Sequence, residues 1–103
     1  MGTWGKQSRR KVWVQTLLEN IERALAEKRF AFALRFCDEL LREDPQNLQG
    51  WLIKGHLAWK LQKDTAKAIK CYQQVLILGG YESSNVFVAQ ARTCLTQLLE
   101  LGS

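Results

Sequence analysis

Residues 51–76, WLIKGHLAWKLQKDTAKAIKCYQQVL, contain the pattern that decides the fold. Apolar or small side chains recur every three or four residues on both sides of the polar stretch 62–64. This spacing is the period of an amphipathic helix, in which such residues share one face. A short polar stretch between two periodic runs is typical of a turn. The segment therefore predicts two helices joined by a tight connection.

The same period extends over most of the remaining chain. Helices are expected at about 10–28, 30–43, 47–62, 65–78 and 84–101. Pro45 ends the second helix, because the residue before a proline is pushed out of the α region, and Gly79-Gly80 supplies a stop for the fourth. Ser83 or Ser84 is the expected N-cap of the fifth. No alternating strand pattern competes, so the predicted fold class is all-α.

The predicted helices repeat in pairs. In the first helix of each pair, Leu17 aligns with Trp51 and Ala24 with Ala58 at an offset of 34. In the second helix of each pair the offset is 35, as for Ala33 and Ala68. One residue has therefore been inserted in the turn between Leu61 and Thr65. A period near 34 in helix pairs is typical of tetratricopeptide repeats.

Trp51, Gly55, Ala68 and Tyr72 stand at the spacing that this family favours, and the chain resembles the tetratricopeptide repeat (TPR) family over residues 14–101. The resemblance implies antiparallel helix pairs stacked as a short solenoid of about two and a half repeats. Repeat 1 is expected at about 14–47 and repeat 2 at about 48–82, with a capping helix at about 84–101. A generic helical bundle is the alternative architecture.

The resemblance also implies a binding surface. In such repeats the first helix of each pair lines a concave groove. The implied groove is largely apolar, suits a peptide or a helix of a partner protein, and has Trp59 as its expected centre, although Trp59 also fits a core position between repeats. Its expected contact residues are Leu18, Gln49, Leu52, His56, Trp59, Lys60, Phe87 and Ala91.

Charge is concentrated at the N-terminus. Residues 1–11 contain four cationic side chains and no acid, whereas residues 12–103 hold 11 basic and 10 acidic ones and carry a net charge of only +1. The segment 1–11 is therefore expected to be a basic tail ahead of a helical domain at 12–101. Anionic contacts through it would involve Lys6, Arg9, Arg10 and Lys11. Four charges without a basic body disfavour a dedicated nucleic-acid binder.

Catalytic and metal-binding patterns are not found. His56 is the only histidine, and Cys37, Cys71 and Cys94 form no CxxC pair. A zinc site needs about four clustered ligands, so no metal, cofactor or catalytic residue is expected. The cysteines fit small core positions in a reducing compartment, which predicts a cytoplasmic protein. No run approaches the length of a membrane span, and the N-terminus has no apolar segment typical of a secretory signal.

Three functional hypotheses follow, and none of them is an enzyme. The first is a protein–protein interaction adaptor or scaffold that holds a partner segment in the apolar groove. The second is a nucleic-acid or anionic-surface binder that uses the basic N-terminal segment. The third is a self-associating structural module, because a short solenoid leaves a terminal apolar face open.

Overall fold

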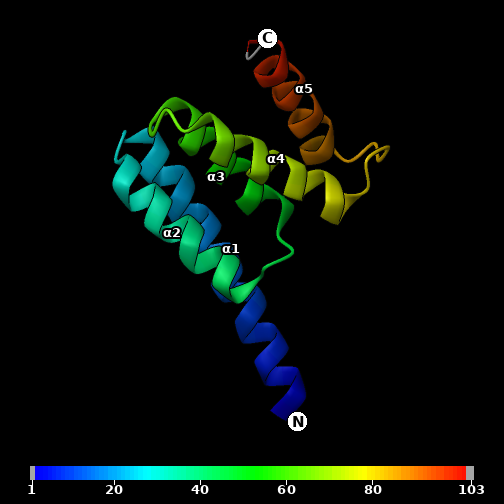
Figure 1. Ribbon diagram of the computed structural model, residues 1–103. Coiled ribbons are helices and arrows are strands. Elements are labelled where there is room, and N and C mark those ends of the chain that lie inside the picture. Colours follow the sequence, from blue (N-terminus) through cyan, green and yellow to red (C-terminus); the bar gives the residue numbers. More distant parts are fainter. Residues whose placement is uncertain (1, 102–103) are drawn as a thin grey trace. The chain divides into compact units, whose positions relative to one another are not determined.

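The computed structural model describes the backbone of residues 2–101 and the side chains of residues 9–101. Within this part of the chain there are five helices and no strand, which confirms the all-α prediction (Figure 1). They are α1 (Gly2–Ala26), α2 (Phe30–Glu43), α3 (Leu48–Lys60), α4 (Thr65–Gly79) and α5 (Val86–Leu101).

The chain divides into two units, each with its own packed interior. The first unit, Met1–Pro45, contains α1 packed against α2. The second unit, Gln46–Ser103, contains α3, α4 and α5, each of which contacts the other two. The division after Pro45 lies close to the predicted boundary between the repeats at residue 47.

The core of the first unit comes from one stripe on each of its two helices. These side chains are Leu17, Ile21, Ala24, Ala33, Cys37, Leu40 and Leu41. They recur at three and four, so they face one side of each helix, and burying them supplies most of the free energy that holds the hairpin together. Helix α2 ends at Glu43 as predicted, and Asp44 donates its backbone N–H to the carbonyl of Leu40.

Helix α1 begins at Gly2, well before the predicted start near Arg10. Most of the segment expected to be a tail is therefore a continuation of this helix. No proline interrupts residues 2–11, and adding residues to an existing helix costs far less than nucleating a new one. The side chain of Lys6 lies outside the described residues.

Helices α3 and α4 approach closely at one point. A Cβ atom on Gly55 would lie only 2.7 Å from Tyr72 Cε1, so the absence of a side chain at Gly55 makes room for the buried tyrosine ring. The second core gathers around this contact and comprises Leu52, Ala58, Ala68, Tyr72, Val75, Leu76, Val88, Ala91 and Leu98. A residue without a side chain is therefore needed at position 55, because the ring of Tyr72 occupies the space that a side chain would fill.

The turns of the two hairpins have the same unusual backbone conformation. Lys28 and Lys63 both have positive φ, 59° and 56°, and they are 35 residues apart. Arg29 donates its backbone N–H to the carbonyl of Ala24, and Asp64 donates to Ala58. The second connection is longer by one residue, which agrees with the insertion predicted from the sequence.

Side-chain caps define the helix starts of the second unit. Asn47 accepts from the backbone N–H of Gly50 at 2.8 Å, and Asp64 accepts from Lys67 at 3.0 Å. Asn85 accepts from Phe87 and Val88, so the cap of α5 is Asn85 and not Ser83 or Ser84, as the sequence predicted. Ser83 Oγ instead accepts from the N–H of Asn85 and shapes the turn ahead of it. Asparagine competes well with serine for this position, so residue type alone did not distinguish them.

Candidate protein-binding surface

Helices α3 and α5 together form a surface with two open hollows. The first hollow, of about 420 Å³, is lined by His56, Val86, Ala89, Gln90, Thr93 and Cys94. The second, of about 340 Å³, is lined by Trp59, Gln97, Glu100 and Leu101. His56 and Trp59 lie one turn apart on α3, and Cys94 and Gln97 lie one turn apart on α5. We call this pair of hollows the α3–α5 surface.

His56 connects the first hollow to the core. Its Nδ1 lies 2.7 Å from Tyr72 Oη, at hydrogen-bond distance, and the two rings meet edge to face with centroids 5.5 Å apart. Burial lowers the pKa of His56 below its ordinary value of 6.5, and the positive charge of Lys60 lowers it further. The imidazole is therefore neutral at pH 7. A neutral imidazole offers one donor and one acceptor.

Tyr72 is the buried end of this connection. Burial raises the pKa of its hydroxyl far above the ordinary value, and a hydrogen bond with Cys94 together with the proximity of Cys71 adds to the shift. The phenol consequently stays protonated at neutral pH and holds His56 in place. Its contacts with Cys94 and His56 link both helices of the surface to α4.

Trp59 has two roles in the second unit. It packs against the core and also lines the second hollow, and the ammonium group of Lys60 lies 4.1 Å from the centroid of its ring. Trp59 is therefore half-buried, with part of its ring on the core and part open to the second hollow, and its role as a contact residue stays a prediction. A cation over an aromatic face is attracted by the ring quadrupole, which fixes Lys60 at the edge of the surface.

The remaining predicted contact residues divide into three groups. Leu52 and Ala91 are buried in the core, so they act in packing and not at a surface. Gln49 and Phe87 are half-buried on α3 and α5, and neither lines either hollow of the α3–α5 surface. Leu18 is half-buried on α1 and belongs to the first unit.

Sequence reasoning missed the part of the surface that comes from the outward face of α5. An offset of 35 from Trp51, Gly55 and Ala58 leads to the exposed residues Val86, Gln90 and Thr93. Three of the hollow-lining residues were thus detectable from the repeat. They were overlooked because only the positions of the expected concave groove were carried over to this helix.

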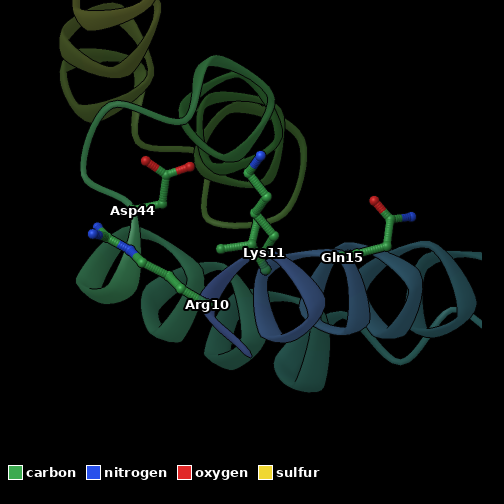
Figure 2. A pocket seen from close by; sticks show the side chains of 5 residues that line it. Arg10, Lys11, Gln15 and Asp44 are labelled. Atoms are coloured by element: carbon green, nitrogen blue, oxygen red, sulfur yellow. The ribbon is translucent and has the colours of Figure 1, made fainter. Parts of the chain in front are cut away.

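The basic residues predicted for anionic contact lie on α1. Arg9, Arg10 and Lys11 are exposed. Arg10 and Lys11 line an open hollow within the first unit together with Val14, Gln15 and Asp44 (Figure 2). The guanidinium of Arg10 donates to the backbone carbonyl of Glu43 at the end of α2. Arg10 is therefore occupied in part by a structural contact, because cations stabilise the carbonyls at a helix C-terminus.

Metal-binding clusters and membrane-spanning helices are absent from the described part of the chain. Among its side chains, no group of three or more His, Cys, Asp or Glu residues is placed to hold a metal ion. None of its helices is both long and apolar enough to cross a membrane.

No known protein-family model matches the chain, and no curated protein sequence matches it either. The tetratricopeptide resemblance stays a prediction that rests on this chain's own residues.

Proposed function

We propose that the chain is a non-catalytic interaction module that holds an amphipathic helix of a partner protein on the α3–α5 surface. The observation that carries the proposal is the open face of α5. Helix α3 uses its Trp51, Gly55 and Ala58 face to pack against α4, as the contact between Gly55 and Tyr72 shows. The equivalent face of α5, with Val86, Gln90 and Thr93, lines the first hollow instead.

The α5 face has the geometry of a helix-packing face. Val86, Ala89, Gln90 and Thr93 follow the spacing i, i+3, i+4 and i+7, which places them on one side of the helix. Partner helices that lie in grooves are anchored by apolar side chains at the same spacing. A partner helix can therefore lie along α5 and insert one anchor into each hollow.

The residue types favour a separate partner over a close intramolecular contact. Where α3 has Gly55 and Ala58, α5 has the longer polar side chains of Gln90 and Thr93. These hold an incoming helix farther from the α5 backbone than α4 lies from α3. They also offer hydrogen bonds at the edge of an otherwise apolar wall, and a few placed polar groups give a binding site its specificity.

The TPR resemblance supports the same function, because repeats of this kind present extended surfaces to protein partners. Fold by itself does not determine function, so the proposal depends on the α3–α5 surface. The three cysteines form no disulfide in this structure. This agrees with the proposed cytoplasmic, reducing location.

The test uses two surface changes on α5 and one control. Ala89→Arg with Thr93→Arg fills the first hollow with charge, whereas Gln73→Arg with Ile77→Arg places the same charge on exposed positions of α4. Captured partners are identified by mass spectrometry, and a synthetic peptide of the main partner is titrated by calorimetry. We expect the α5 variant to lose the partner while its circular dichroism and the binding of the control are unchanged.

Equal capture by the α5 variant and the wild type would disprove the proposed site. Light scattering distinguishes the self-association hypothesis, since a second copy on α5 would make the mass depend on concentration. Loss of that dependence in the α5 variant, with no heterologous partner, would replace the adaptor function by self-association.

A further inference from the structure

The N-terminal part of α1 extends beyond its partner helix. Helix α1 has 25 residues and α2 has 14, and Arg10 already reaches Glu43, the last residue of α2. Residues 2–9 therefore continue past the end of α2 within this unit (Figure 1). At about 1.5 Å per residue this extension is roughly 12 Å long.

One face of this region combines a cation with exposed apolar side chains. Arg9, Val12, Trp13 and Thr16 follow the spacing i, i+3, i+4 and i+7, so they lie on the same side of α1. They line one shallow hollow. Val12 is 65% exposed and Trp13 is 43% exposed, high values for such side chains. We call these four residues the α1 face.

The segment that leads into the α1 face is rich in positive charge, and Arg9 is the cation on the face itself. Residues 1–11 contribute four positive charges and no negative one, and the first turn of α1 has no acidic residue. The helix N-terminus adds the positive end of the helix dipole. The rest of the chain is nearly neutral, so this end of α1 attracts an anionic surface.

The exposed apolar residues identify which anionic surface fits. A nucleic acid would engage the cations and could stack on Trp13, but its phosphate backbone gains nothing from the aliphatic side chain of Val12. A bilayer surface suits both groups, because tryptophan prefers the headgroup region and neighbouring apolar side chains enter the acyl boundary. Arginine keeps its charge among the headgroups while its aliphatic stem lies against apolar surface.

We propose that the α1 face docks reversibly on membranes that contain anionic phospholipids. The contact is peripheral, with the helix resting on the bilayer surface. Each basic residue near an anionic leaflet strengthens binding by about fivefold. The proposal is independent of the α3–α5 surface, because the α1 face belongs to the first unit and the α3–α5 surface to the second.

The experiment is co-sedimentation of the full chain with vesicles. Vesicles of phosphatidylcholine alone are compared with vesicles that also contain phosphatidylserine. We expect binding only to the latter and a decrease of about fivefold when the one cation of the α1 face is removed in Arg9→Gln. The matched control, Lys70→Gln, removes one exposed charge from the second unit and should bind like the wild type.

Two further variants separate the membrane from other polyanions. Trp13→Ser and Val12→Gln retain every charge, and each should weaken vesicle binding at unchanged helicity. A DNA oligonucleotide provides the comparison, since a contact driven by phosphates would have the same affinity in the wild type and in Val12→Gln. Vesicle binding that is insensitive to Trp13→Ser and Val12→Gln, or equal loss in both charge variants, would overturn the proposal. Tighter binding to the oligonucleotide than to the anionic vesicles would also overturn it.

Discussion

The two helical hairpins, α1–α2 and α3–α4, differ in how side-chain size is distributed at one pair of equivalent buried positions. At one pair of equivalent positions the first hairpin has Ile21 and Cys37, both fully buried, and the second has Gly55 and Tyr72. In the first hairpin the large residue lies on the first helix and the small one on the second helix. In the second hairpin the order is reversed. Close-packed interiors tolerate such swaps when the total volume is kept.

This exchange gives the two hairpins different chemistry. The thiol of Cys37 is enclosed in its hairpin, whereas the ring of Tyr72 is long enough to bring its hydroxyl to His56 near the surface. The residue equivalent to His56 in the first hairpin is the exposed Glu22. The same helical pairing thus produces a plain packing unit in one half and a polar connection to a candidate binding surface in the other.

The largest expected effect comes from truncating the two equivalent second-helix residues. Tyr72→Ala should cost about 4 kcal/mol, as loss of a fully buried aromatic ring usually does. Cys37→Ala should cost about 1 kcal/mol, because a buried thiol acts as a small apolar group. Chemical unfolding combined with amide hydrogen exchange assigns each loss to its hairpin. Equal losses would contradict the inference that the ring of Tyr72 contributes more to packing than the thiol of Cys37.

A smaller effect is expected at Gly55, where the missing side chain leaves room for the ring of Tyr72. Gly55→Ala should gain about 1 kcal/mol of helix propensity but lose about 1 to 3 kcal/mol to the clash with Tyr72, and so destabilise the protein. In the Tyr72→Ala background the clash is absent, and the same change should stabilise it. A double-mutant cycle measured by urea unfolding gives the coupling. Stabilisation by Gly55→Ala in the wild type would show that the ring moves aside without cost.

The smallest expected effect depends on pH and concerns only the second hairpin. Since the pKa of His56 is lowered on folding, the unfolded chain binds the proton more tightly and protonation favours unfolding. The stability contributed by neutral His56 is therefore complete above pH 6.5 and is lost as the pH falls from 6.5 through the folded-state pKa. NMR titration of this single histidine and urea unfolding at several pH values test it.

Two variants make the pH test specific. His56→Gln should remove the dependence in this window, and Lys60→Gln should raise the pKa of His56 because a nearby positive charge is removed. A His56 pKa above 6.5 in the wild type would contradict the described burial of the ring.

Helical period, Pro45 and the double glycine were enough to predict five helices from the sequence, since these are local properties of the chain. The offset of 34 to 35 also anticipated the equivalent buried positions and the longer second turn. The start of α1 was misplaced by the expectation that a basic segment is a tail. The N-cap of α5 was misplaced because Ser83, Ser84 and Asn85 are all suitable caps.

The sequence by itself determined which residues form helices and which positions hold small or large side chains, because periodicity and side-chain volume follow directly from the residue types and their order. Only the tertiary structure decided which apolar residues stay accessible. Leu52 and Ala91 proved to be core, whereas Val86 and Thr93 line a hollow, and a helical pattern alone does not distinguish a face covered by another helix from an open one. The hydrogen bond between His56 and Tyr72 likewise required the packing of α3 on α4. Exposure depends on which elements cover a face, and that is a property of the assembled fold.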